Sequence, residues 1–105
     1  MKNDLYLVDS NVLINLNRGD TKIAELIHGK TLLYSIITEI ELLSYPEISP
    51  AEIIRVKAML SECLFVGIDD EVKQQAIAIR RHTKMKLPDA VVVATALCTN
   101  VIFDL

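Results

Sequence analysis

The sequence contains no tryptophan, only two cysteines, three glycines and three prolines, and aromatic residues make up 5% of it. Cys63 and Cys98 have no CxxC spacing and stand among apolar neighbours. This predicts buried free thiols rather than a disulfide or a zinc site. The chain also has no internal repeat, linker or low-complexity segment, so its 105 residues predict a single domain, 1–105.

Long hydrophobic runs and a strong excess of basic charge are absent too. No run approaches the roughly 20 apolar residues that span a bilayer, and the first ten residues do not resemble a signal peptide. We therefore expect a cytoplasmic protein without a membrane span. The net charge of −3 argues against a strongly basic nucleic-acid binder, although the run RRHTKMK, residues 80–86, holds four Lys or Arg residues and one His. With 51% hydrophobic residues the chain can still form a core.

Apolar strands alternate with amphipathic helices along the chain. The patterns predict strands at 5–8, 31–35, 63–68 and 101–105, and helices at 10–17, 21–29, 36–44, 50–61, 69–84 and 87–97. The last helix is ambiguous, because Val91–Val93 favour a strand whereas Pro88, Asp89 and the length of the apolar run favour a helix. This βααβααβααβ order predicts a three-layer α/β/α domain with a mostly parallel central sheet.

Helix starts and inward faces follow from local patterns. Ser49, Pro50 and Glu52 form the clearest start signal, a capping box with proline at the first helical position. Gly29 is expected to end the second helix. The predicted inward-facing positions are Ile23, Leu26 and Ile27; Ile53, Val56 and Leu60; and Val72, Ala76 and Ile79.

Three acids stand where parallel strands and the following helices meet. Asp9 directly follows the first strand, Glu41 lies in the helix after the second, and Asp89 begins the last helix. Sites in open parallel sheets form at the carboxyl ends of the strands, so these carboxylates could converge in an acidic pocket that holds a metal ion.

Each acid also has a purely structural interpretation. Asp9 could cap the helix that starts at Ser10, Glu41 could complete a capping box with Thr38, and Asp89 could simply favour the positive end of its helix. Glu39 competes with Glu41, and the two point about 200° apart on a helix. We prefer Glu41 because it shares a side with Ile37 and Ile40, which are expected to face the core.

Three blocks of the sequence together resemble a known family. "LVDSNVLI", "SIITEIELL" and "KLPDAVVVATAL" are similar, in order and spacing, to the motifs of PIN domains, particularly the VapC-type toxin ribonucleases. Each block alone is weakly specific, but the three together cover nearly the whole chain. The matching positions include Asp9 with Asn11, Thr38 with Glu41, and Asp89.

The resemblance implies an Mg²⁺- or Mn²⁺-dependent endoribonuclease, the toxin of a toxin–antitoxin pair. It implies that Asp9 and Asp89 ligate the metal and that Glu41 acts directly or through water, with Asn11 and Thr38 in support. Arg80, Arg81, Lys84 and Lys86 then become candidate contacts to RNA phosphates; otherwise the run complements its own helix dipole. His82 fits that solvated run better than a catalytic role.

The resemblance also implies partners and a further segment. Such toxins pair as homodimers and bind a small antitoxin across an apolar groove, which Ile36, Ile37, Leu42, Leu43 and the apolar face of 50–61 could line. Members of the family usually continue past the last strand with a further acid. Here the sequence ends at "VIFDL", so we expect a shortened C-terminus that lacks this acid, with Asp104 as a weak substitute.

Two rival functions remain compatible with these patterns. A degenerate PIN module would bind RNA or protein without cleaving RNA. A receiver domain of the response-regulator kind would need adjacent acids after the first strand, but "VDSN" offers only Asp9 there.

Overall fold

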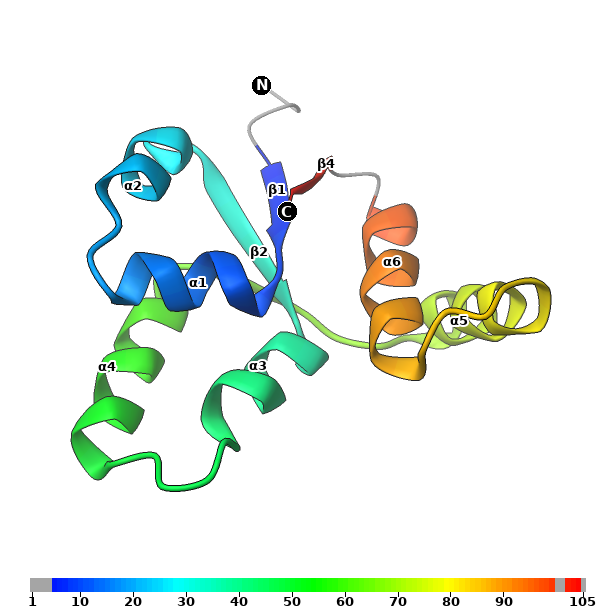
Figure 1. The fold of residues 1–105 in the computed structure, drawn as a ribbon. Coiled ribbons are helices and arrows are strands. Elements are labelled where there is room, and N and C mark those ends of the chain that lie inside the picture. Colours follow the sequence, from blue (N-terminus) through cyan, green and yellow to red (C-terminus); the bar gives the residue numbers. More distant parts are fainter. Residues whose placement is uncertain (1–4, 100–101, 105) are drawn as a thin grey trace.

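A computed structural model describes residues 5–99 and 102–104 (Figure 1). The elements are β1 (Leu5–Val8), α1 (Ser10–Asn17), α2 (Thr21–Ile27), β2 (Thr31–Ser35), α3 (Ile36–Leu43), α4 (Pro50–Leu60), β3 (Leu64–Val66), α5 (Asp70–His82), α6 (Leu87–Thr99) and β4 (Ile102–Asp104). Their order is the predicted one, and the bounds differ from prediction only at element ends, where terminal turns are the hardest to place.

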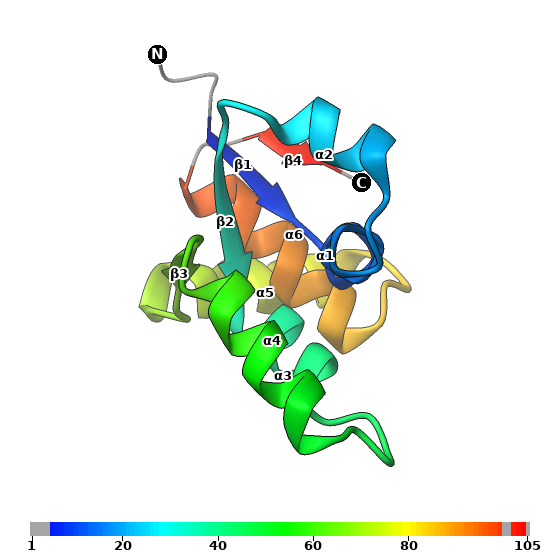
Figure 2. The ribbon, with the colours of Figure 1, turned by 90° about the vertical axis from the view of Figure 1, so that its left-hand side faces the viewer.

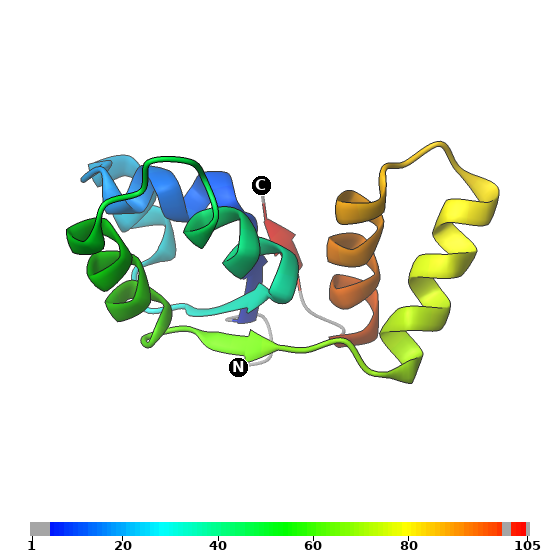
Figure 3. The ribbon, with the colours of Figure 1, turned by 90° about the horizontal axis from the view of Figure 1, so that it is seen from below.

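The four strands form one parallel sheet in the order β3-β2-β1-β4. Figure 2 shows β1 between β2 and β4. Helices α1 to α4 lie on one side of the sheet, whereas α6, with α5 outside it, lies on the other (Figure 3). Right-handed crossovers require this split, because the chain moves from β1 to β3 in one direction and returns past β1 to β4 in the other. The predicted three-layer α/β/α class is confirmed.

Both faces of the central strands are buried, each by alternate residues. Val8 and Leu32 pack among α1, α3 and α4, whereas Leu7 and Leu33 pack against α6. Leu7 and Leu33 are also partners in the β1–β2 register. An all-parallel sheet covered on both faces needs this unbroken apolar pattern, which explains why "LYLV" and "TLLYS" carry so few polar residues.

Helix α6 lies between the sheet and α5, and its small residues make this possible. Val92 and Ala96 contact the sheet side, whereas Val91 and Ala94 pack with Val72 and Ala76 of α5. The buried Thr95 is satisfied within the helix, because its Oγ1 donates to the Val91 carbonyl at 2.8 Å. Burial on two opposite sides explains why this segment has no polar face and why a helix forms despite three successive valines.

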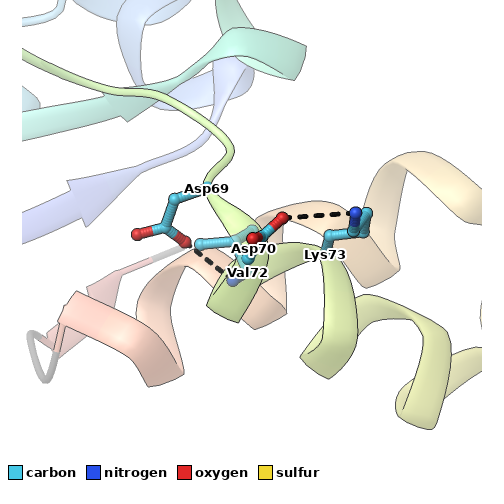
Figure 4. A network of polar contacts seen from close by, with 4 residues as sticks. All are labelled: Asp69, Asp70, Val72 and Lys73. Atoms are coloured by element: carbon cyan, nitrogen blue, oxygen red, sulfur yellow. Dashed lines mark hydrogen bonds and ion pairs between the residues drawn. The ribbon is translucent and has the colours of Figure 1, made fainter.

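Local capping signals behave largely as the sequence predicts. Ser49 accepts from the Glu52 amide at 3.1 Å and Glu52 accepts from the Ser49 amide at 3.2 Å, which completes the predicted capping box of α4. At the start of α5, Asp69 Oδ1 accepts from the Val72 amide (Figure 4). Gly29, with φ of +77°, follows the C-cap of α2 and ends that helix as expected.

The inward-facing prediction for Leu26 is wrong. Leu26 is 64% exposed, whereas Ile23 and Ile27 pack against the core from α2. Leu26 and Ile27 lie about 100° apart on either side of Ile23, and the core contacts only the side of Ile23 and Ile27.

Cys63 and Cys98 are free thiols, as predicted, but they are half-buried rather than fully buried. Burial raises the pKa of both thiols. Within residues 5–99 and 102–104, no helix has the length and apolar character needed to cross a bilayer.

The tight packing of α6 leads to a stability prediction. Ala94 has no exposed surface, so Ala94→Leu should lower the free energy of unfolding by about 1–3 kcal/mol through overpacking. Leu97→Ala changes the same helix at a 59% exposed position and should stay within about 0.5 kcal/mol of the wild type. Urea unfolding followed by circular dichroism measures both, and equal effects would contradict the described packing of α6.

Candidate functional site

A pocket of about 400 Å³ lies where α1, α3 and α6 come together at the carboxyl ends of β1 and β2. Its lining combines three carboxylates, three other polar residues and four apolar ones: Asp9, Ser10, Asn11, Ile37, Thr38, Glu41, Met85, Asp89, Val92 and Val93. All three acids singled out in the sequence therefore line one pocket. No Lys or Arg residue is among the lining residues, so the wall is acidic.

Asp9 reaches the pocket because β1 ends at Val8 and α1 begins at Ser10. Its Oδ1 accepts a hydrogen bond from the Val12 amide at 3.1 Å, so Asp9 is the N-cap of α1. The structural interpretation of this residue is thus correct, and it coexists with a place in the pocket wall. One carboxylate oxygen satisfies the helix, and the described residues provide no hydrogen bond to the other.

Glu41 lines the pocket from the middle of α3, where its Oε1 accepts a hydrogen bond from Ser10 Oγ at 3.0 Å. Of the two isoleucines expected to face the core on the same side as Glu41, only Ile37 does so. Ile37 is partly buried beside the core, but Ile40 is 53% exposed. Glu39 lies on another side of α3, toward Tyr34: burial raises the pKa of the Tyr34 hydroxyl, and the charge of Glu39 adds to the rise.

The predicted capping box between Thr38 and Glu41 does not form. Helix α3 begins one turn earlier, at Ile36, and its N-cap is Ser35, whose Oγ accepts from the Thr38 amide at 3.3 Å. The buried Thr38 instead lies beside Ser35, with 3.5 Å between their hydroxyl oxygens. This removes the structural explanation for Glu41, since a residue in the middle of α3 has no orphan amide to cap.

Asp89 lies in the first turn of α6. In the same turn, the Ala90 amide donates a hydrogen bond to the Lys86 carbonyl. The helix dipole favours a carboxylate at this position, so the structural interpretation of Asp89 also stands. Two of the three pocket acids are thus at helix N-termini. The positive ends of α1 and α6 offset part of the repulsion among the carboxylates.

The donor chemistry of the pocket fits a hard divalent cation, although the carboxylates do not form a closed cage. Across residues 5–99 and 102–104, no three His, Cys, Asp or Glu side chains come close enough to form a ready metal site. Mg²⁺ commonly takes one or two carboxylates directly and keeps several waters. An open pocket with spaced carboxylate oxygens suits that mode of binding better than it suits a dehydrated ion.

The basic run divides into two parts with different surroundings. Arg80, Arg81 and His82 form the last turn of α5, where they complement its dipole, and Arg80 Nη1 donates to the Met85 carbonyl at 3.1 Å. Lys84 and Lys86 are exposed and flank Met85 in the loop before α6, and Met85 lines the pocket. The two lysines are therefore the exposed sequence neighbours of a residue in the pocket wall.

Two weaker candidates fare differently. Asn11 lines the pocket and is exposed, but it makes no hydrogen bond to Asp9 within the described part of the chain. Asp104 pairs with Val8 in the β1–β4 register. The placement of its side chain lies outside what the structure describes, so the prediction for Asp104 stays a prediction.

The sequence pattern of the PIN domain family matches residues 6–103, nearly the whole chain. The chain belongs to the PIN domain family. Family membership, which the three sequence blocks predicted, is thereby confirmed. No curated protein sequence gives a significant match.

Solved structures with the same fold agree with this assignment. A chain of a toxin–antitoxin complex from Klebsiella pneumoniae is similar with a TM-score of 0.80 and 26% identity, over 93% of this PIN domain and 82% of that chain. VapBC2 from Rickettsia felis, bound to a promoter DNA fragment, gives a TM-score of 0.83 at 12% identity, over 94% and 85%. VapC20 of Mycobacterium tuberculosis, described as a toxin that cleaves the sarcin-ricin loop, gives 0.67 at 19% identity, over 94% and 89%.

Sequence patterns missed several pocket residues, among them Met85 and Ser10. Met85 enters the wall from the basic run, and Ser10 contacts Glu41. No local signal marks Met85, because its position depends on how the loop before α6 folds back. For Ser10 the sequence did offer a signal. Because Asp9 caps α1, the hydroxyl of the next residue is free to contact another element.

The double role of Asp9 leads to a prediction. Asp9→Ala removes the cap of α1 and should lower the free energy of unfolding, without added metal, by about 1 kcal/mol. Asp9→Asn keeps a capping side chain and should lower the free energy of unfolding by only a few tenths of a kcal/mol. Urea unfolding at neutral pH compares the two variants. An Asn variant as unstable as the Ala variant would exclude capping as the structural task of Asp9.

Proposed function

We propose that this PIN domain is a metal-dependent endoribonuclease and the toxin of a toxin–antitoxin pair. The observation that carries the proposal is the meeting of Asp9, Glu41 and Asp89, from three separate elements, in one pocket at the carboxyl edge of the sheet. The likeness to chains of toxin–antitoxin complexes supports the same conclusion.

In this proposal, the pocket residues have different roles in RNA hydrolysis. Asp9 and Asp89 are the proposed direct ligands of Mg²⁺ or Mn²⁺. When bound, such an ion would neutralise charge on the phosphate and make water a better nucleophile. Glu41 carries a carboxylate oxygen that can accept a hydrogen bond from the attacking water and so orient it toward phosphorus. One phosphorus–oxygen bond of the RNA backbone is replaced by a bond to the water oxygen.

RNA must approach a pocket wall that carries three negative charges. Lys84 and Lys86 are exposed on either side of Met85 and can bind phosphates next to the scissile one. They are better candidates than Arg80, whose guanidinium is already engaged with the Met85 carbonyl. Arg81 extends the same basic surface from the end of α5.

An RNA cleavage assay with Mn²⁺ tests the catalytic proposal. Asp9→Asn, Glu41→Gln and Asp89→Asn should each lower kcat/KM by about 100-fold or more, since even residues behind metal ligands commonly cost 10–100-fold. Mn²⁺ should also raise the Tm of the wild type by mass action, and Asp9→Asn should abolish that rise.

Two controls make the assay decisive. The double variant Lys84→Ala/Lys86→Ala keeps all three acids and should raise KM far more than it lowers kcat. Equal cleavage by the wild type and all acid variants would indicate a contaminating nuclease. Metal-independent RNA binding without cleavage would favour the alternative, a PIN module that only binds RNA or protein.

A second groove next to the acidic pocket supports the antitoxin part of the proposal. It measures about 530 Å³ and lies among α1, α3 and α4, with Leu13, Ile14, Leu42, Val56 and Met59 as its main apolar lining. Of the residues expected there from sequence, Leu42 and Val56 line this groove, whereas Ile37 lines the acidic pocket. Glu41 belongs to both linings, so an occupant of the groove would reach the site of catalysis.

Charge at the groove indicates what kind of segment it suits. Arg18 and Arg55 line it together with Glu41 and Glu52, and neither arginine forms an ion pair within the described part of the chain. An antitoxin segment with apolar anchors and an acidic side chain would match both features. We also expect the toxin to self-associate as a homodimer, which sedimentation of the purified protein would measure.

The groove proposal has a matched pair of charge reversals on α4. Arg55→Glu should weaken binding of the antitoxin, to be sought as the product of a small adjacent gene, by about tenfold, because Arg55 lines the groove. Lys57→Glu makes the same charge change on the same helix outside the groove and should leave binding unchanged. Isothermal titration of each variant with that neighbouring protein gives the comparison, and equal losses would place the partner elsewhere.

A further inference from the structure

The hydroxyl of Ser10 connects two of the three elements that build the acidic pocket. Its Oγ donates to Glu41 Oε1 at 3.0 Å and so joins the first turn of α1 to the middle of α3, 31 positions apart in the sequence. Both residues line the pocket. This contact therefore acts directly on a carboxylate that the proposed function uses.

The hydroxyl is available for this contact because another residue does the capping. Asp9 accepts from the Val12 amide and occupies the N-cap position of α1, which leaves Ser10 at the first helical position with no amide to satisfy. Asn11, one of the two supporting residues that the family resemblance implied, is exposed and bonds to none of the three acids within the described part of the chain. The side chain that supports a pocket acid is thus Ser10, the residue before Asn11.

Glu41 is a side chain that needs such support. It is exposed on the surface of α3, where a glutamate has several accessible rotamers and loses entropy when it is held in one. The bond from Ser10 selects a rotamer in which Oε1 is engaged, and the described residues provide no hydrogen bond to Oε2. The positive end of α1 lies next to this carboxylate and favours the same placement.

We propose that Ser10 is a positioning residue that holds the Glu41 carboxylate in the acidic pocket, ready to act on a divalent ion or its water. The inference rests on the proposed metal-dependent function. It assigns Ser10 no contact with substrate and no proton transfer. Its effect is to raise the fraction of molecules in which Glu41 already points into the pocket, which strengthens metal binding as well as cleavage.

Mn²⁺ binding to the full chain, followed by electron paramagnetic resonance of the free ion, tests this role without relying on activity. Ser10→Ala should weaken Mn²⁺ binding by about three- to tenfold, the range expected for one modest hydrogen bond. Ser10→Thr retains the hydroxyl and should restore binding to near the wild-type value. Ser44→Ala removes an exposed hydroxyl from the end of α3 and should have no effect.

A double variant links the effect to Glu41 in particular. In the Glu41→Ala background, Ser10→Ala should cause no further loss of Mn²⁺ binding, because the carboxylate that it positions is gone. A further loss equal to that seen in the wild-type background would overturn the role of Ser10 through Glu41. Unfolding midpoints of all variants, measured without metal, identify any that are merely unstable.

The outcomes separate this inference from the proposed function. If the wild type binds Mn²⁺ and Ser10→Ala binds it equally well, the positioning role is wrong and the nuclease proposal stands. If Ser10→Thr fails to restore binding, the hydroxyl is not the active feature and the role is again wrong. If the wild type binds no Mn²⁺ at millimolar concentration, the metal site itself is wrong, and the positioning role falls with it.

Discussion

Strand β1 is hydrogen-bonded along both edges and buried on both faces, and the rest of the structure is arranged around it. Because its neighbours β2 and β4 run parallel to it, their carboxyl ends meet at one edge of the sheet. The connection that leaves β1 crosses one face, and the connection that arrives at β4 crosses the other. Asp9, the residue directly after β1, thus stands where helices from both outer layers approach each other.

This arrangement brings negative charges together, and the fold offsets their repulsion with helix termini. Asp9 caps α1, and Asp89 lies in the first turn of α6, so both carboxylates face positive ends of helices. Glu41 has no helix N-terminus of its own and depends on the Ser10 hydroxyl. The capping and site interpretations of these acids are compatible, because a carboxylate has two oxygens and a cap uses one.

Local patterns predicted most of the fold because they express local physics. Short apolar runs became buried strands, the Ser49–Glu52 capping box formed, and the valine-rich segment became a helix because it is buried against the sheet and α5. The wrong predictions have two kinds of cause. Ile40 is exposed because the described elements dock on the other side of α3, which depends on distant parts of the chain, whereas Thr38 is not a cap because the nearby Ser35 starts the helix three residues earlier.

The sequence by itself determined the order of elements, the parallel three-layer class, the PIN family and the identity of the three acids, since each depends on short-range patterns or on motif spacing. Only the tertiary structure decided that the acids line one pocket, that Met85 completes its wall, and that Ser10 bonds to Glu41. The physical reason is that a hydrogen bond across 31 residues depends on how two helices dock on the sheet. Neither helix encodes that docking alone.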